Sequence, residues 1–300
     1  MYIGVDWGGT KIEVVALGAD GSEQARFRHD TPRGDYNGCL ALIGTMVAEA
    51  EATTGEAGTV GVGIPGSLEP LSRRGKGGNS TWINGMPVEA DLIATLQRPV
   101  RVENDANCLA VSEAIDGAGA GHRMVFAVIL GTGAGAGIAI GGRAHSGPNN
   151  SAGEWAHNPL PFPNVSELPG PDCYCGRTGC LETWISGTGF CNDYRRHNGA
   201  TLPGTDIVAL MRSGDRLARM VYERYIDRVA RGLAVVVNVL DPDVFVMGGG
   251  MSNIDELYED LGPSLARWTF STVFTTPIVK AVHGDSSGVR GAAWLWRDVD

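Results

Sequence analysis

Two stretches of the chain share one local pattern, in which a buried strand runs into a glycine-rich turn and a second apolar strand follows directly. The first is Tyr2–Leu17, with its turn at residues 7–11, and the second is Val125–Ile140, with its turn at residues 131–135. Short apolar runs bounded by glycine are typical of strands. Because the pattern occurs once in each half, we predict a duplicated α/β architecture that holds a nucleotide between two lobes.

The glycine turns suit phosphate groups, although a hairpin without a ligand would have the same sequence. The Rossmann fingerprint and the P-loop both need a helix directly after their glycines, and here a strand follows instead. Backbone amides, a threonine hydroxyl and a lysine ammonium can bind phosphate oxygens, and an aspartate at the strand end can hold hydrated Mg²⁺. The candidate cofactor-binding residues of the two turns are Asp6, Gly8, Gly9, Thr10, Lys11, Gly131, Thr132 and Gly133.

A third glycine run, Gly248-Gly249-Gly250, follows a predicted strand at residues 243–247. Without side chains there, a purine and its ribose can approach the backbone closely. An ordinary tight turn would look the same. Further predicted helices span residues 35–54, 104–115, 182–197, 215–240, 253–268 and 287–296, and further strands span residues 60–64, 100–103 and 277–282.

A cysteine-rich loop predicts a zinc site. Cys173, Cys175 and Cys180 follow His157 in the sequence, and two glycines lie between the last two cysteines. A Cys-x-Cys pair does not readily close on itself, because its side chains point apart in an extended segment, whereas a metal gathers them. Three thiolates and one imidazole complete a tetrahedral zinc shell, so we expect a structural zinc. Unrelated loop cysteines are the alternative.

Two carboxylates flank this loop. Glu154 lies shortly before His157, and Glu182 lies shortly after Cys180. Closing the metal site would bring both carboxylates to one place, where they could form the floor of a binding site. Solvated surface glutamates fit the spacing equally well.

Asn104 and Asp105 stand between the predicted strand at residues 100–103 and the helix that follows. Asn or Asp is expected there as a helix cap whatever the function. In the functional interpretation, Asp105 projects from the carboxyl end of the strand, where α/β sheets place their ligands, and accepts a proton from a substrate hydroxyl.

The charge balance narrows the set of partners. The chain has 34 acidic and 24 basic side chains, which argues against a nucleic-acid or anionic membrane surface. The first residues include no basic leader, and the longest apolar run, near residues 233–240, is too short to cross a bilayer. Cys39, Cys108 and Cys191 lie in surroundings typical of free core thiols. We therefore expect a cytoplasmic protein.

The motifs together resemble the ROK family of bacterial sugar kinases and sugar-responsive repressors. The most specific match is His157 followed by Cys173-x-Cys175-Gly176-x-x-Gly179-Cys180-x-Glu182, and residues 6–11, 103–107, 130–133 and 248–250 match as well. Residues 79–82, 157–161 and 283–288 are most similar to the fructokinase or manno(fructo)kinase branch. Trp7 and Ala156 depart from the usual smaller residue and glycine, respectively.

The resemblance implies a two-lobed ribonuclease-H-like fold of the actin-like ATPase or hexokinase type. The implied domains are 1–119 plus 286–300, which form a smaller α/β domain, and 120–285, which form a larger α/β domain with the zinc site. The glycine-rich stretch at residues 116–121 supports a boundary there. A homodimer is also implied.

The resemblance further implies an ATP- and Mg²⁺-dependent kinase that phosphorylates the 6-hydroxyl of a hexose, with fructose as the expected substrate and mannose as a further one. Asp105 would be the catalytic base, oriented by Asn104. Glucokinase and N-acylhexosamine kinase are alternatives within the family, and a non-catalytic sugar-sensing repressor is the alternative of another class. Such repressors carry a DNA-binding segment before the kinase-like body, for which we expect no room before the first strand. The implied sugar-binding residues are Gly66, Asn79, Asn104, Asp105, Glu154, His157 and Glu182.

Overall fold

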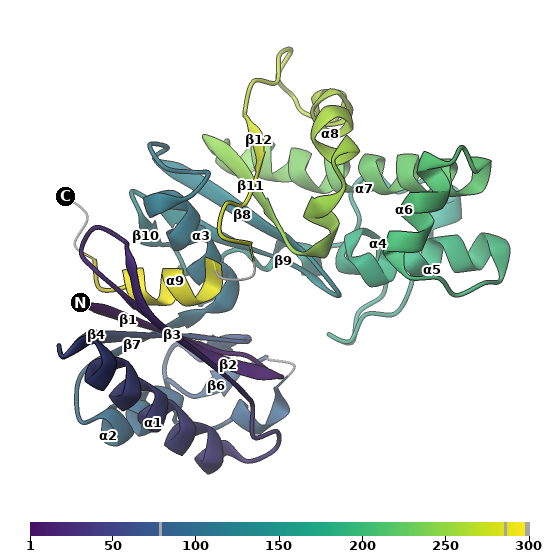
Figure 1. Ribbon diagram of the computed structural model, residues 1–300. Coiled ribbons are helices and arrows are strands. Elements are labelled where there is room, and N and C mark those ends of the chain that lie inside the picture. Colours follow the sequence, from purple (N-terminus) through teal and green to yellow (C-terminus); the bar gives the residue numbers. More distant parts are fainter. Residues whose placement is uncertain (78–79, 285–286, 298–300) are drawn as a thin grey trace. The chain divides into compact units, whose positions relative to one another are not determined.

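The computed structural model describes residues 1–77, 80–284 and 287–297, and two five-stranded sheets organise it (Figure 1). The chain forms two units. Unit 1 holds Met1–Ala127, Gly137–Ala152 and the described part of Ala281–Asp300, and unit 2 holds Val128–Ala136 and Gly153–Lys280. The domain limits derived from the resemblance stay a prediction.

The first sheet lies in unit 1 and begins with the predicted hairpin. Its strands are β1 (Tyr2–Trp7), β2 (Lys11–Leu17), β3 (Glu23–Asp30), β4 (Thr59–Ile64) and β7 (Val100–Asn104). Their order is β3-β2-β1-β4-β7, with β1 to β3 antiparallel and β4 and β7 parallel to β1. The edge strand β3 was absent from the sequence prediction, because its residues are mostly polar and exposed.

Helices cover both faces of this sheet (Figure 1). On one face lie α1 (Tyr36–Thr54) and α2 (Val88–Leu96), and on the other lie α3 (Asp105–Asp116) and the C-terminal helix α9 (Ser287–Trp294). Two strand glycines permit the close approach of α9: a Cβ at Gly4 or Gly61 would lie 1.9 Å from a carbonyl oxygen of this helix. The C-terminal helix therefore completes the core of the N-terminal sheet.

The second sheet has the same strand order as the first. Its strands are β8 (Met124–Leu130), β9 (Ala134–Ile140), β10 (Arg143–Ala144), β11 (Val244–Gly248) and β12 (Ile278–Lys280). Their order is β10-β9-β8-β11-β12. If the five strands of each sheet are numbered along the chain from one to five, both sheets have the order 3-2-1-4-5. The shared order confirms the predicted duplication.

The helices of unit 2 pack around its long helix α7 (Arg216–Leu240). The others are α4 (Glu182–Ile185), α5 (Gly187–Asn198), α6 (Gly204–Arg212) and α8 (Glu256–Ala266). The prediction of one helix over residues 182–197 is wrong at Ser186, whose backbone is extended and whose hydroxyl accepts a hydrogen bond from the amide of Gly189. Ser186 ends α4 and caps α5, as serine commonly does.

Short elements complete the chain: β5 (Ser67–Leu68), β6 (Gly75–Lys76), η1 (Thr81–Ile83), η2 (Glu154–His157), η3 (Val165–Glu167) and η4 (Gly250–Asn253). Within the described ranges, the helices are too short or too polar to cross a membrane.

Candidate active site

The junction of β7 and α3 carries Asn104 and Asp105, and Asn104 is the helix cap. Its side-chain oxygen accepts hydrogen bonds from the amides of Ala106, over 2.9 Å, and Asn107, over 3.2 Å. Its amide group donates over 2.7 Å to the carbonyl oxygen of Gly66. Capping therefore accounts for Asn104, and Asp105 is the first helical residue, whose carboxylate accepts a hydrogen bond from the amide of Ala106 over 2.8 Å.

A polar network behind this junction fixes its geometry. Glu103 accepts hydrogen bonds from the amide of Asn104, over 2.8 Å, and from the hydroxyl of Ser146, over 2.6 Å. The buried Asn107 donates to Glu103 over 3.1 Å and accepts from the amide of Ile138 in β9 over 3.1 Å. Because these polar groups are hydrogen-bonded to one another, they fix the turn that presents Asp105.

The first glycine turn lies beside Asp6 in unit 1. The amide of Gly8 donates to the carbonyl of Lys11 over 3.0 Å, which closes the hairpin, while Thr10 is held through its carbonyl by the amide of Thr31 over 3.0 Å. Burial raises the pKa of Asp6 to about 7, and the negative charges of Asp105 and Glu13 add to the rise. A nearby cation would stabilise the charged form of this buried carboxylate, so Asp6 and its acidic neighbours fit a Mg²⁺ ion.

The second glycine turn lies in unit 2 and is braced by three hydrogen bonds. The amide of Gly187 donates to the carbonyl of Gly131 over 2.7 Å, and the hydroxyl of Thr188 donates to the carbonyl of Thr132 over 2.7 Å. Glu182 accepts from the amide of Ala134 over 3.1 Å. The turn is therefore pre-organised before any ligand binds.

A cavity of about 900 Å³ opens beside this turn, and its lining is largely apolar. The second turn, the third glycine run and the start of α5 all contribute to it: its lining includes Gly131, Thr132, Gly187, Thr188, Pro203, Gly250 and Met251. Gly249 must be glycine, because its φ is +80° and a Cβ would lie 2.6 Å from the carbonyl of Leu130. Size and lining suit a purine nucleoside.

Sequence reasoning missed Gly187 and Thr188 in this cavity. The signal was available, since residues 187–189 repeat the Gly-Thr-Gly of residues 131–133. Met251 and Pro203 carried no such signal, because only the fold brings them to the cavity.

The four predicted zinc ligands come together in unit 2. The donor atoms of His157, Cys173, Cys175 and Cys180 all lie within 4.8 Å of one another. The Sγ atoms of Cys175 and Cys180 are 3.6 Å apart, and Sγ of Cys173 is 3.6 Å from Nδ1 of His157. With Zn–S bonds of about 2.3 Å, a tetrahedral site places its sulfur atoms about 3.8 Å apart, so the donor set is compatible with zinc.

The other nitrogen of His157 points to a different set of groups. Its Nε2 lies 3.0 Å from the hydroxyl of Tyr174 and 4.0 Å from a carboxylate oxygen of Glu154. Nδ1 can therefore serve the metal while Nε2 serves a polar partner, and the two predicted roles of His157 are chemically compatible. Asn79, the remaining predicted sugar contact, lies outside the described residues.

The site agrees with what the chain is similar to. Residues 2–299 match the ROK family. An N-acetyl-D-glucosamine kinase from Escherichia coli O157:H7 is 38% identical over 98% of this chain and 99% of the relative, and one from Pectobacterium carotovorum subsp. carotovorum is 40% identical over 98% of each.

Solved structures agree on the fold. A ROK hexokinase from Thermus thermophilus superposes with a TM-score of 0.87 at 29% identity, over 98% of this chain and 97% of that one. A ROK glucokinase from Streptomyces griseus, in complex with glucose and AMPPNP, has a TM-score of 0.77 at 29% identity, over 97% of each chain. The curated relatives are named for N-acetylglucosamine, so they do not support the expectation of a fructokinase and favour the N-acylhexosamine alternative.

Proposed function

Because the chain belongs to the ROK family, whose sugar kinases use ATP, we propose that it transfers the terminal phosphoryl group of ATP to the 6-hydroxyl of N-acetylglucosamine. The observation that carries this choice of sugar is the 38–40% identity with N-acetylglucosamine kinases over nearly the whole of both chains. It replaces fructose as the expected substrate.

In this proposal Asp105 is the general base. It receives the proton of the sugar hydroxyl as that oxygen attacks the phosphorus atom, a role that requires a carboxylate aimed from a rigid support. The capping bonds of Asn104 and the contacts of Glu103 supply that support. Asn104 also holds the carbonyl of Gly66, and both residues belong to the proposed sugar site.

ATP would be held by glycine turns in both units. In unit 1 the backbone of Gly8 and Gly9, with Thr10 and Lys11, would bind phosphate groups, and Asp6 would hold Mg²⁺. In unit 2 the turn Gly131-Thr132-Gly133 does the same, and the apolar cavity bordered by Gly250 takes the base and ribose. Bound Mg²⁺ neutralises the charge that develops on the phosphoryl oxygens.

Glu154, His157 and Glu182 are the unit 2 residues that we assign to the sugar. A carboxylate accepts hydrogen bonds from sugar hydroxyls, and Nε2 of His157 can donate one when Nδ1 faces a metal. The zinc that we place between His157, Cys173, Cys175 and Cys180 is structural, because those four donors leave no open position. It would hold the loop that presents these three residues. A homodimer, expected from the resemblance, is a further proposal, and sedimentation equilibrium tests it.

The test of this function is an ADP-release assay with Mg²⁺ and ATP on a panel of N-acetylglucosamine, N-acetylmannosamine, glucose, mannose and fructose. We expect the highest kcat/KM with N-acetylglucosamine. A higher value with fructose would restore the earlier expectation and keep the reaction. If a sugar binds but no sugar of the panel leads to release of ADP from ATP, a sugar-sensing protein would be favoured instead.

A further inference from the structure

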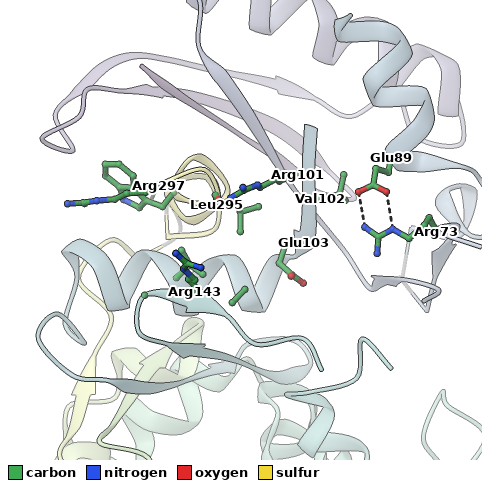
Figure 2. A pocket seen from close by; sticks show the side chains of 12 residues that line it. Arg73, Glu89, Arg101, Val102, Glu103, Arg143, Leu295 and Arg297 are labelled. Atoms are coloured by element: carbon green, nitrogen blue, oxygen red, sulfur yellow. Dashed lines mark hydrogen bonds and ion pairs between the residues drawn. The ribbon is translucent and has the colours of Figure 1, made fainter. Parts of the chain in front are cut away.

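A second cavity, of about 330 Å³, lies in unit 1, and half of its lining residues are charged (Figure 2). Four arginines and two glutamates line it: Arg73, Arg101, Arg143, Arg297, Glu89 and Glu103. Its lining residues include none of the two glycine turns, and no part of the proposed reaction uses its arginines. The chain as a whole has a net charge of −10, so a local excess of positive charge is against its general trend.

Both carboxylates of the cavity are already engaged. Glu89 forms a two-bond ion pair with Arg73, over 2.8 and 2.9 Å (Figure 2). Glu103 accepts hydrogen bonds from Ser146 and from the backbone and side-chain amides at the β7–α3 junction. Arg101, Arg143 and Arg297 are the other charged residues of the lining.

These three arginines come from separate parts of the chain, and Arg101 and Arg297 stack on tryptophan rings. Arg101, from β7, lies over the ring of Trp296 at 4.2 Å and donates to the carbonyl of Leu295. Arg297 lies over the ring of Trp294 at 4.9 Å. An arginine stacked on an aromatic face keeps donors at its edge, which is the arrangement that recognises phosphate oxygens.

We propose that this cavity binds a small phosphate-bearing anion, either inorganic phosphate or a sugar phosphate, and that occupation slows phosphoryl transfer. Its volume equals that of roughly ten water molecules at about 30 Å³ each, which leaves room for a phosphate group and part of a carrier molecule. Glu103 links the cavity to the reaction, because its carboxylate lines the cavity and also holds the amide of Asn104 over 2.8 Å. An anion beside it repels that carboxylate and disturbs the junction that positions Asp105.

Isothermal titration calorimetry with inorganic phosphate tests the binding, without any assumption about the reaction. We expect saturable binding by the wild type and a loss of affinity of about tenfold or more in both Arg143→Gln and Arg297→Gln, since each removes a charged donor. Arg216→Gln is the matched control, because Arg216 is exposed at the start of α7 in unit 2. Absence of saturable binding, or equal binding by the wild type and both cavity variants, overturns the site.

A second titration with N-acetylglucosamine 6-phosphate separates the two sources of phosphate: tighter binding than inorganic phosphate, again lost in both variants, identifies a sugar phosphate. The regulatory part rests on the proposed function and is tested by kcat at saturating sugar and ATP. We expect phosphate to lower kcat at least about threefold in the wild type and in Arg216→Gln, but not in Arg143→Gln. An unchanged kcat in the wild type overturns the regulation and leaves the binding result standing, and absence of any turnover refutes the proposed function alone.

Discussion

The side-chain amide of Asn104 donates a hydrogen bond of 2.7 Å to the carbonyl oxygen of Gly66, while the oxygen of the same side chain caps α3. One residue thus fixes both the helix that begins with Asp105 and the loop that follows β4. Gly66 itself has a φ of +80°, so the loop depends on glycine as well as on this bond.

Two substitutions separate these roles of Asn104. Asn104→Asp keeps a good cap but loses the donor to Gly66, so we expect stability within about 0.5 kcal/mol of the wild type and a fall in kcat/KM of about tenfold or more. Asn104→Ala loses the cap too, which costs about 1 kcal/mol further. Urea unfolding and the ADP-release assay measure the two effects. Full activity in Asn104→Asp would show that the bond to Gly66 does not support the reaction.

Asp105→Asn should lower kcat by about two to four orders of magnitude, the usual cost of removing a general base, with little change in KM. The substitution preserves size and the helical position, so unfolding should be almost unaffected. Asp255→Asn is the control, because Asp255 is exposed and makes no capping hydrogen bond at the start of α8. A kcat of Asp105→Asn within a factor of about three of the wild type would exclude Asp105 as the base.

Protein purified without chelator should contain about one zinc ion per chain. Cys175→Ser should weaken zinc binding by at least about 100-fold, the upper end of what loss of an outer partner costs. Because Cys175 is exposed, this variant loses a ligand with little loss of packing. Cys191→Ser, outside the cluster, should keep the metal. Elemental analysis measures the zinc content of the wild type and both variants. A correctly folded wild type without stoichiometric zinc would rule out a structural zinc site.

Low pH should lower the free energy of unfolding, because it protonates a glutamate in a buried ion-pair network of unit 2. Burial by itself raises the pKa of Glu167, but hydrogen bonds from Arg231 and Arg228 hold it at about 2, below the usual 4.5. Because the folded-state pKa is depressed, this glutamate contributes stability above pH 4.5 that is lost as the pH falls from 4.5 toward 2. The contribution is about 3 kcal/mol at neutral pH.

Glu167→Gln tests that network. It leaves two buried guanidinium groups, of Arg228 and Arg231, without this partner, so we expect a loss of about 3–5 kcal/mol at pH 7. The variant should also unfold with a shallower dependence on pH between 4.5 and 2. Denaturant unfolding at several pH values in this range measures the slope, and equal slopes for wild type and variant would rule out Glu167 as the titrating group.

Gly249→Ala should damage the glycine turn beside the cavity that we assign to the nucleotide. The new Cβ would lie 2.6 Å from the carbonyl group of Leu130, in a residue whose φ is +80°. We expect a stability loss of about 1–3 kcal/mol and a higher KM for ATP. Gly262→Ala is the matched control, because Gly262 lies inside α8 with open space around it, and alanine there should stabilise by up to about 1 kcal/mol. An unchanged KM for ATP in a folded Gly249→Ala would place the nucleotide elsewhere.

The secondary-structure elements that were predicted most accurately are those with the clearest sequence pattern. The hairpin of Tyr2–Leu17 and the long helix ending at Leu240 are confirmed to within one or two residues at their limits, because their apolar residues recur with a clear period. The break at Ser186 and the strand β3 were missed. A serine inside a helical pattern gives no sign that it will cap, and a polar edge strand has no buried face to reveal it.

The sequence by itself determined what is local: the glycine turns, the Asn104-Asp105 junction and the His157 and cysteine residues of the candidate metal site, each set lying within one stretch of the chain. Tertiary structure alone decided which distant groups meet. The carbonyl of Gly66 reaches Asn104, the amide of Ala134 reaches Glu182, and Arg101, Arg143 and Arg297 gather at one cavity. Such pairings depend on how strands and helices pack, and burial acts on surface area without regard to sequence distance, so no local pattern encodes them.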